Sequence, residues 1–536
     1  MASNEHETQK DILKTPISRR DLLKGAAVIG AGLTLGPLAA ACGSSSATSS
    51  PSPSASSGPK KGGALKVGLV GGSAKERLDG ALATTEPEIA NCFQLYDALL
   101  GWDANYKLIP LLAEEWSPNT DASVWTVKLR KGVTFHDGSP LTADDVVFSY
   151  KRIIDPKNPL MGASQLSSLK ENGIAKVDAQ TVKFTLTGPN SVFDEAMALY
   201  GNIIVPQAFD PKAPVGTGPF KLVSFKPGEQ IAYKAFADYW GGAPYVDTLT
   251  LQEYADTNAR VNALLGGTVQ AISQLPSAQV KVIEGQNMKV LDAKTGAWQP
   301  ITMRIDQKPF SDVKVRQAFR LIADRQAMIE QAYAGYGWVG NDMYAPFDPG
   351  YPSQLEQRAQ DLAQAKSLLK QAGYGSGLTV TLTTSDAVGS GAVAAAQVFA
   401  EQAKGAGVTV NVNKVDPSVF YGDQYLKWTF AQDFWYTRNY LAQANQGTMP
   451  DAPYNETHWS NAKWLSLVEE AFKTGDKTKR DQLVGEAAQI EYEQGGLLIW
   501  AFNDQIDGYS AKIGGLVPNK SGVPLSSFHF NQVYFV

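Results

Sequence analysis

Residues 112–156 read LAEEWSPNTDASVWTVKLRKGVTFHDGSPLTADDVVFSYKRIIDP. Apolar and polar residues alternate from 125 to 129, which predicts a half-buried strand. The run HDGSP at 136–140 is rich in turn-forming residues, so the chain is expected to reverse direction there. The residues TADD at 142–145 have the spacing of a capping box and predict a helix that stops before Pro156. The stretch therefore predicts a strand, a turn and a helix in succession.

Strand-like alternation and helix-like periodicity both occur again on either side of this stretch, so the expected fold class is mixed α/β. Strands are expected at 65–70 and 182–186, and helices at 315–329, 362–369, 462–474 and 478–494. Residues 378–384 and 408–412 have strand patterns on either side of an Ala-rich helix at 391–405. This order predicts a βαβ unit with parallel strands.

The composition is that of an ordinary globular protein. The 536 residues include 48 Lys and Arg against 53 Asp and Glu, which gives a formal net charge of -5. Hydrophobic residues make up 43% of the chain and charged residues 19%. The negative net charge argues against a nucleic-acid partner. The proportions of hydrophobic and charged residues argue against a multi-span membrane protein. The length predicts two to four domains or lobes.

The first 41 residues have the order of an export signal. Residues 18–24 read SRRDLLK, and the uncharged run that follows to Ala41 is too short and too rich in Gly for a spanning helix. The pair Arg19 and Arg20 resembles a twin-arginine signal, which exports proteins that are already folded. We expect residues 1–41 to be this signal.

A lipid anchor is expected directly after the signal. The run ends in LAAAC, where small residues precede Cys42 as in a bacterial lipoprotein cleavage site. The alternative is an ordinary cysteine behind the signal. Residues 42–62 are rich in Ser, Pro and Gly and are expected to act as a flexible tether. The expected location is the outer face of the cytoplasmic membrane, or the periplasm if the cell has an outer membrane.

Residues that carry metal or covalent chemistry are few. With two Cys and four His in the chain, no metal site and no cofactor are expected. Cys92 lies in an apolar segment without a second Cys or a His beside it, so we expect it in the core. His136, in the HDGSP turn, is expected to be structural. No nucleophile motif, zinc helix or phosphate-binding glycine loop occurs, so no enzyme activity is expected.

Five segments together resemble solute-binding protein family 5, the extracytoplasmic peptide, dipeptide and nickel receptors of ABC importers. They are residues 112–156, VGTGPFKL from Val215, DYWGGAPYVDTLTL from Asp238, PFSDVKVRQAFRLIADRQAMIEQAYAG from Pro309 and AKSLLKQAGY from Ala365. In order and spacing they cover residues from about 63 to 536. The resemblance implies a receptor whose partners are a permease and an ATPase of an importer.

The resemblance also implies a two-lobe periplasmic-binding-protein-like fold of the large cluster C type, with an inserted subdomain in the first lobe. The implied boundaries are 63–96, 212–299 and 505–536 for the first lobe, 97–211 for the inserted subdomain and 300–504 for the second lobe. The chain is expected to cross between the lobes near 298–302 and 498–505. The segment 112–156 is then structural and lies away from the ligand cleft.

The richest candidate for ligand contact is WTFAQDFWYTRNY at 428–440. Its candidate residues are Asp433, Trp435, Tyr436, Arg438 and Asn439. Aromatic rings supply contact area, Arg438 can pair with a ligand carboxylate through two hydrogen bonds, and Asp433 can receive an amine. The alternative is an aromatic core strand with a solvated Arg and Asp.

Peptide-binding members of the family commonly carry a Trp, then a Tyr, then Asp-Pro in this region, and that Asp holds the amino group of the ligand. Trp435 and Tyr440 fit the pattern, but Leu441, Ala442 and Gln443 follow, so the acid is absent. The sequence therefore departs from the family pattern for binding a free peptide amino terminus.

Three further loops are candidates for contact with the ligand. Ser73 follows the first expected strand, Trp298 and Gln299 lie in GAWQP at the expected crossing, and NETHW occupies 455–459. Ordinary loop or turn residues are the alternative at each place.

The expected function is that of a monomeric, lipid-anchored receptor that captures a peptide or a related small solute between two lobes. A receptor of the same fold for a metal complex or an oligosaccharide is the second hypothesis, although the scarcity of His argues against nickel held by imidazole. A secreted hydrolase is the third hypothesis, and it lacks a nucleophile and a base. No nucleic-acid partner is expected.

Replacing both Arg19 and Arg20 by Lys in the full-length chain is expected to block export. A guanidinium group presents a planar set of donors that the Lys ammonium cannot reproduce, so the pair is not exchangeable at a recognition site. Cell fractionation followed by immunoblotting measures how much precursor stays in the cytoplasm. Unchanged export of the Lys variant would point to the general secretion route instead.

Overall fold

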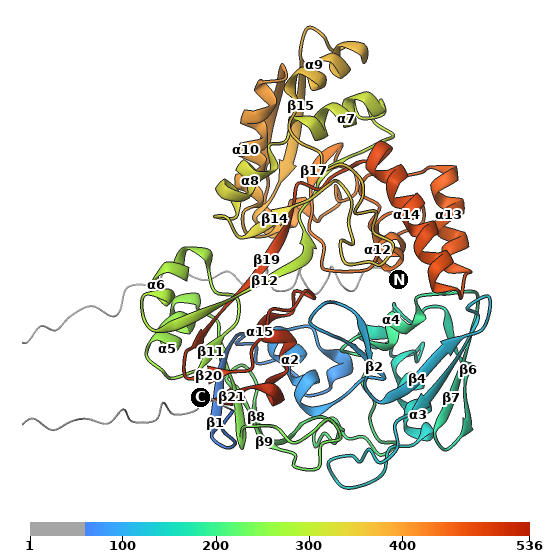
Figure 1. Cartoon of the computed structure of the whole chain (residues 1–536), viewed down its shortest axis with the longest axis vertical. Coiled ribbons are helices and arrows are strands. Elements are labelled where there is room, and N and C mark those ends of the chain that lie inside the picture. The colour runs from blue at the N-terminus through green and yellow to red at the C-terminus, as the bar shows by residue number, and fades with distance from the viewer. Residues whose placement is uncertain (1–58) are drawn as a thin grey trace, which may run out of the picture. The chain divides into compact units, whose positions relative to one another are not determined.

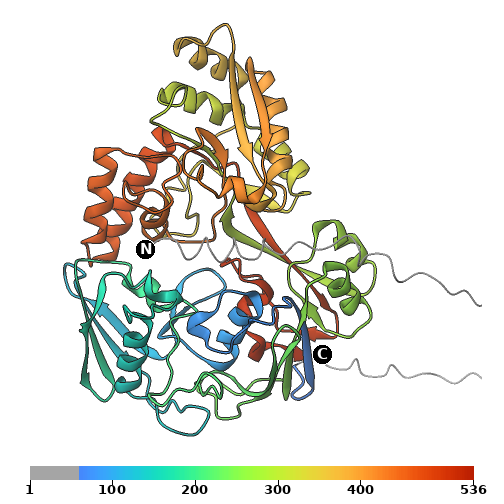
Figure 2. The same cartoon turned by 180° about the vertical axis from the view of Figure 1, so that it is seen from behind.

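The computed structural model describes residues 59–536. The expected signal at 1–41, Cys42 and most of the tether lie outside the described residues. Within 59–536 no helix is both long enough and apolar enough to cross a membrane. The described part of the chain contains sheets of eight, five and four strands and two two-stranded sheets, and Figure 1 and Figure 2 show it from opposite sides.

The eight-stranded sheet combines strands from both ends of the described chain. In spatial order its strands are β12 (Met288–Trp298), β19 (Ala501–Ser510), β11 (Ala271–Ile272), β1 (Ala64–Val70), β10 (Thr248–Tyr254), β9 (Gln230–Ala235) and β8 (Phe220–Lys226), and β14 (Gly337–Val339) pairs with β19. Leu65, Val67 and Leu69 of β1 are buried, and β1 runs parallel to β10 and β11. The strand predicted at 65–70 is confirmed.

Four helices pack against strands of this sheet. They are α2 (Glu86–Leu95), α5 (Thr257–Leu265), α6 (Val280–Glu284) and α15 (Pro524–Ser527). Cys92 lies on α2 as a free, buried thiol, which confirms its predicted place in the core. A short pair of strands, β20 (Ile513–Gly514) and β21 (Tyr534–Phe535), lies near the C-terminal end of the chain.

The five-stranded sheet contains the predicted βαβ unit. Its strands in spatial order are β16 (Val408–Lys414), β15 (Leu378–Thr384), β17 (Phe430–Gln432), β13 (Ile301–Met303) and β18 (Leu497–Leu498). β15 and β16 are parallel and are connected through α10 (Ala392–Lys404), which confirms the prediction. The short helix α11 (Pro417–Phe420) follows β16.

The apolar stripe predicted over 315–329 is divided between two helices. α7 (Val313–Ile322) ends before Asp324, and α8 (Arg325–Ala332) begins after it. The Asp324 carboxylate caps α8 by accepting a hydrogen bond from the Ala327 N–H at 3.0 Å. The stripe continues through the break because both helices bury their apolar side chains in the same core. The next predicted helix is confirmed as α9 (Leu362–Gln371).

The four-stranded sheet contains the segment 112–156. Its strands in spatial order are β4 (Ala113–Pro118), β5 (Val124–Leu129), β7 (Thr181–Leu186) and β6 (Leu169–Asp178). Its helices are α3 (Ala143–Ile153) and α4 (Phe193–Met197), and the hairpin of β2 (Leu100–Trp102) and β3 (Leu108–Pro110) precedes it. Thr142 and Asp145 form the predicted capping box at the start of α3.

The predicted helices near the C-terminal end are α13 (Ala462–Phe472) and α14 (Lys477–Gln494). They lie side by side as a helical hairpin, with the shorter α12 (Tyr440–Gly447) next to them in Figure 1. Trp464 of α13 and Val484 of α14 are buried in a shared core. This core also contains Trp298 and Trp435, so the hairpin supports the segment predicted to bind ligand.

Two short connections between the eight-stranded sheet and the five-stranded sheet lie at the ends of β12 and β18, and the chain passes between the two sheets again before and after β14. β12 ends at Trp298 in the first of these sheets, and β13 begins at Ile301 in the other. In the return direction β18 ends at Leu498 and β19 begins at Ala501. Because β12 and β19 pair with each other, the two connections lie close together, and Figure 1 shows the two strands side by side.

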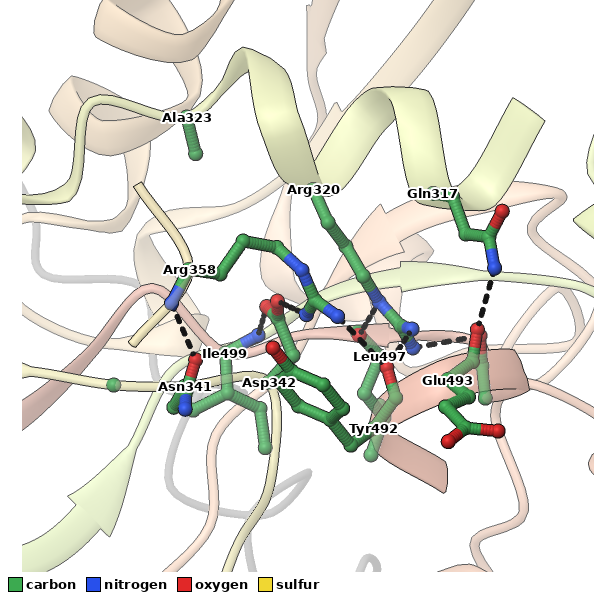
Figure 3. A network of polar contacts seen from close by, with 12 residues as sticks. Gln317, Arg320, Ala323, Asn341, Asp342, Arg358, Tyr492, Glu493, Leu497 and Ile499 are labelled. Atoms are coloured by element: carbon green, nitrogen blue, oxygen red, sulfur yellow. Dashed lines mark hydrogen bonds and ion pairs between the residues drawn. The ribbon is translucent and has the colours of Figure 1, made fainter. Parts of the chain in front are cut away.

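Buried guanidinium groups fix the residues that precede the second connection (Figure 3). The Arg320 side chain is fully buried and donates to the carbonyl oxygens of Tyr492, Gly495 and Leu497 at 2.8, 2.7 and 2.9 Å. A buried charge is costly unless hydrogen bonds compensate it. Arg320 therefore joins α7 to the end of α14 and to β18.

Asp342 neutralises part of this buried charge. Its carboxylate pairs with Arg325 at 2.8 Å and with Arg358, and it accepts a hydrogen bond from the Ile499 N–H at 3.0 Å. Burial opposes the charged carboxylate, but Arg325 and Arg358 outweigh it and hold the pKa of Asp342 below its ordinary value. The network thus fixes the backbone at the second connection.

Asp342→Ala is expected to lower the free energy of unfolding by about 3 to 5 kcal/mol, because truncation leaves two buried guanidinium groups without their carboxylate. Chemical denaturation measures the change. Glu401→Ala is the matched control, since Glu401 pairs with Lys404 on the surface and such a pair contributes less than about 1 kcal/mol. Equal effects of the two substitutions would contradict the structural role of Asp342.

Candidate functional site

The end of β12 is joined to residues 433–439 by two aromatic residues. The Trp298 N–H donates to the Trp435 carbonyl at 3.0 Å, and the Trp435 N–H donates to the Trp298 carbonyl at 2.9 Å. The two rings stack with their centroids 6.0 Å apart, and Trp298 also stacks on Tyr344 at 5.9 Å. Two candidate residues that are far apart in the sequence therefore meet at the first connection between the sheets.

Arg438 and Tyr436 extend from this tryptophan pair. The Arg438 guanidinium carbon lies 5.7 Å from the centroid of the Trp435 ring, within the range of a cation–π contact. Tyr436 is 64% exposed, and its ring contacts Phe434 at 5.6 Å. Trp435 is only 8% exposed, so most of its ring is already buried against the protein. The segment thus alternates a buried ring with more exposed side chains.

Asp433 is buried in a network of protein donors. Its carboxylate accepts hydrogen bonds from the Tyr421 hydroxyl at 2.9 Å, the Tyr425 hydroxyl at 2.9 Å and the Phe434 N–H at 2.8 Å. Asp433 is only 4% exposed, so the alternative in which this Asp is solvated is wrong. Recognition of a ligand amine by Asp433 stays a prediction.

Glu456, in the NETHW turn, forms a buried carboxyl pair with Asp433. Burial raises the pKa of both groups, and the charge of Asp433 and its hydrogen bond with Glu456 raise the pKa of Glu456 further. Two buried carboxyl groups in contact cannot both ionise easily, so the pair holds a proton. Glu456 is therefore the neutral member that allows Asp433 to stay in the interior.

The rest of the NETHW turn is held by contacts with nearby backbone. The Asn455 side chain accepts from the Trp459 N–H at 2.9 Å and donates to the Trp459 carbonyl at 3.1 Å. A ring nitrogen of His458 lies 3.0 Å from the Leu426 carbonyl. These contacts fit the structural alternative for this turn.

Gln299 and Ser73 have local partners. The Gln299 amide oxygen accepts from the Tyr333 hydroxyl at 3.0 Å, and its amide nitrogen lies 3.4 Å from the Val388 carbonyl. The Ser73 hydroxyl accepts from the Lys75 N–H at 3.2 Å in the loop after β1. Contact of either residue with a ligand stays a prediction.

Asn439 reaches the four-stranded sheet's helix α4. Its amide nitrogen donates to the Glu195 carboxylate at 3.1 Å. Close by in sequence, the Thr437 carbonyl accepts from the hydroxyl of Tyr106, in the turn between β2 and β3, at 3.0 Å. No local sequence pattern predicts the roles of Tyr106 and Glu195, because each contact joins residues more than 240 positions apart.

Two hollows lie elsewhere on the residues that the structure describes. One has a volume of about 10 Å³, enough for about one water molecule, and is lined by Arg320, Trp459 and Glu491 among others. The other is an open groove of about 540 Å³ between α8 and α10. Neither includes a residue of 433–439, so the chemistry of that segment, and not the shape of these hollows, indicates the candidate site.

No group of three or more His, Cys, Asp or Glu in residues 59–536 is arranged to hold a metal ion.

His136 lies in the turn that the sequence predicts to be structural. Its Nε2 atom lies 2.9 Å from the Gly218 carbonyl oxygen. Burial lowers the pKa of His136 to about 4, so its ring is neutral at physiological pH. The ring therefore acts as a hydrogen-bonding group that joins the turn at 136–140 to residues 216–218.

Residues 107–462 match the family model for the middle part of bacterial extracellular solute-binding proteins, family 5. The chain belongs to this family. A twin-arginine translocation signal also matches residues 16–36, which confirms the predicted export signal. The solute-binding protein is therefore an exported receptor with a two-lobe fold, as its sequence predicts.

Curated relatives cover most of this solute-binding protein. It is 29% identical over 444 residues to the glutathione-binding protein GsiB of Pectobacterium atrosepticum, covering 78% of this chain and 85% of the relative. It is 28% identical over 495 residues to the dipeptide-binding protein of Escherichia coli, covering 83% and 89%.

Solved structures have the same fold. The substrate-binding protein CtaP of an ABC transporter from Listeria monocytogenes aligns with a TM-score of 0.77 at 25% identity, covering 89% of this chain and 100% of that one. HbpA2 from Haemophilus parasuis aligns with a TM-score of 0.77 at 23% identity, covering 88% and 100%. These likenesses confirm the predicted two-lobe α/β fold class.

Glu456→Gln is expected to make the stability of the protein less dependent on pH. The pKa of Glu456 is raised in the folded protein, so its contribution is fully present below the unfolded pKa and is lost as the pH rises through the raised value. A neutral amide does not ionise. The free energy of unfolding, measured at pH 6 and pH 9, should fall more in the wild type, by more than about 1 kcal/mol.

The control for this measurement is Glu470→Gln, because Glu470 is half exposed and pairs with Lys479 on the surface. Parallel losses in wild type and Glu456→Gln between the two pH values would show that Glu456 does not carry the proton.

Proposed function

We propose that this receptor binds a peptide or a related small solute between its lobes, with residues 433–439 and Trp298 as part of the binding wall. The observation that carries the proposal is the pairing of Trp298 with Trp435 at the connection between the two sheets. A ligand at this place would lie beside the connection from β12 to β13. The names of the curated relatives, for glutathione and for a dipeptide, support a peptide-like solute.

The proposed lobes follow the sheets. We propose 63–96, 212–299 and 505–536 as the first lobe, 97–211 as its inserted subdomain and 300–504 as the second lobe. The end of β12 and the start of β13 support the boundary near 299, and the proposed boundary at 504 falls inside β19. The four-stranded sheet, whose strands fall between 113 and 186, supports the separate subdomain.

The proposed ligand chemistry combines aromatic area with a cation. Trp435 and Tyr436 supply ring surface, which binds an extended solute without demanding one side-chain identity. Arg438 lies against the Trp435 ring and can pair with a carboxylate of the ligand through two hydrogen bonds. Asp433, Asn439, Gln299 and Ser73 complete the proposed set, although each has protein partners.

The proposed partners are the permease and the ATPase of an ABC importer, and the receptor acts as a monomer anchored through lipid on Cys42. The twin-arginine signal match and the small residues before Cys42 support this location. A lipid anchor keeps the receptor at the membrane, so capture of the ligand and its delivery to the permease take place at one surface.

The ligand is identified by native mass spectrometry of the protein purified from its own host without unfolding. A peptide or peptide-like mass that leaves on denaturation supports the proposal. A saccharide or a metal complex at stoichiometric occupancy would replace it with the second hypothesis.

Trp435→Ala is expected to weaken binding of the ligand so identified by about 2-fold to 30-fold, because Trp435 is only 8% exposed and acts by supporting Arg438, and a cation–π contact contributes about 0.5 to 2 kcal/mol. Calorimetry measures the dissociation constant, and circular dichroism checks the fold, because Trp435 also packs on Trp298. Trp435→Phe is the matched variant that keeps most of the area. Unchanged affinity in a folded Trp435→Ala protein would place the site elsewhere.

Cys42→Ser is expected to release the exported protein from the membrane, because the thiol that carries the lipid is lost while the signal is unchanged. Fractionation of cells into membrane and soluble parts measures the shift. A variant that stays in the membrane pellet like the wild type would contradict the lipid anchor.

A further inference from the structure

The inserted subdomain contacts the second lobe at the α13–α14 hairpin. The Ser191 N–H donates to the Phe472 carbonyl at 3.0 Å, and the Ser191 hydroxyl donates to the Ala471 carbonyl at 2.8 Å. Arg480 donates to the Ser191 carbonyl at 3.0 Å. Beside these contacts the Gly475 N–H donates to the Thr120 carbonyl at 3.1 Å.

A second set of contacts lies at the proposed ligand segment. The Tyr106 hydroxyl donates to the Thr437 carbonyl, and the Asn439 amide donates to the Glu195 carboxylate. Tyr106 is held for this role, because its ring stacks on Trp102 at 4.2 Å with planes only 5° apart. Both sets join residues of 97–211 to residues of 300–504, and neither uses the two strand connections.

These contacts are hydrogen bonds of a kind that can break and form again. Most of them end on backbone groups, and the carbonyls of Ala471 and Phe472 belong to the last turn of α13, where the Ala471 carbonyl also accepts from the Thr474 N–H at 3.3 Å. Water can replace each hydrogen bond when the surfaces separate, so opening leaves no polar group unsatisfied. An interface that opens and closes needs this property.

We propose that Thr120, Ser191, Tyr106 and Glu195 of the inserted subdomain form a clasp that closes on the second lobe, and that Glu195 enters the closed clasp as a neutral carboxylic acid. The inference rests on the lobe movement of the proposed function, but not on the identity of the ligand. It gives the inserted subdomain a part in the binding cycle, with Glu195 as a positioning residue that acts through Asn439.

The hydrogen bonds at Asn439 favour the neutral form of Glu195. The Asn439 amide nitrogen donates to Glu195, while its amide oxygen is buried and has no hydrogen-bond partner within residues 59–536. A carboxylate can only accept, but a carboxylic acid can also donate. A proton on Glu195 would turn its carboxyl group into a donor beside Asn439, whereas the ionised form adds a further acceptor there.

The charges around Glu195 act in the same direction. Burial is the main cause that raises the pKa of Glu195 to about 8, and the neighbouring carboxylates of Asp194 and Asp348 add to it. The hydrogen bond from Asn439 and the charge of Arg480 oppose the rise without cancelling it. Tyr106, which is itself influenced by the charges of Glu195 and Arg438, stays protonated because burial raises its pKa.

The sign of the pH effect follows from the raised pKa. When the clasp opens, Glu195 meets water and its pKa returns toward about 4.3. Closing therefore takes up a proton at neutral pH. The contribution of Glu195 to the closed form is fully present below the open-state pKa and is lost as the pH rises through about 8.

Hydrogen–deuterium exchange of the ligand-free, full-length protein tests the clasp without a known ligand. The readout is the protection factor, corrected for intrinsic exchange, of peptides that contain the Ser191 and Gly475 amides, since both donate across the clasp. In the wild type we expect protection to fall by about tenfold between pH 6.5 and pH 9. In Glu195→Gln, whose amide is neutral at both values, we expect equal protection.

Controls separate the clasp from general stability. Peptides covering the buried strand residues Val67 and Leu382 report global unfolding, and any change in their protection with pH should be the same in the wild type and in Glu195→Gln. Glu115→Gln is the matched variant, because Glu115 lies on β4 of the same subdomain but pairs with Lys128 of its own sheet, and it should keep the wild-type pH response. Asn439→Ala should lower protection at pH 6.5.

Two results would overturn the proposal. One is wild-type protection of both amides that does not depend on pH. The other is a pH response in Glu195→Gln equal to that of the wild type. Failure of Trp435→Ala to change ligand affinity leaves these measurements unaffected, so the clasp and the proposed ligand site are tested separately.

Discussion

The antiparallel pairing of β12 with β19 is the constraint on which the rest of the structure depends. β12 leads into β13 of the five-stranded sheet, and β18 of that sheet leads into β19, each within three residues, while β14 pairs with the start of β19. Short connections that lie close together permit rotation of one core against the other. Trp298, the last residue of β12, also pairs with Trp435, so the candidate segment is held beside the first of these connections.

The interactions inside the second lobe differ in kind from those between it and the inserted subdomain. Inside, Arg325 and Asp342 form a buried ion pair, and breaking such a pair costs about 3 to 5 kcal/mol. Across the clasp, the contacts are mostly single hydrogen bonds with a net contribution of about 0.5 to 1.5 kcal/mol each. Because the first set is much stronger, the contacts of the proposed clasp can break while those inside the proposed second lobe stay intact.

The sequence predicts what depends on neighbouring residues. The alternation at 125–129, the capping box at 142–145 and the βαβ unit are local patterns, and all three appear in the structure. The apolar stripe at 315–329 does not reveal that the helix is interrupted at Asp324. Two helices that pack on one core keep the same apolar period across that residue. The roles of Tyr106 and Glu195 have no local pattern, since their partners lie more than 240 residues away along the chain.

Ligand choice in such a receptor depends on few residues, since the relatives share the fold while their names differ in the ligand. Where peptide-binding members commonly carry an acid after the Tyr, this chain places Leu441, which is buried in α12. The nearby carboxyl group of Asp433 is occupied by two tyrosine hydroxyls and shares a proton with Glu456. What the segment offers is ring area and the cation of Arg438. A site of this composition favours a solute by its aromatic or extended surface and by a negative charge, and does not depend on a free amino group.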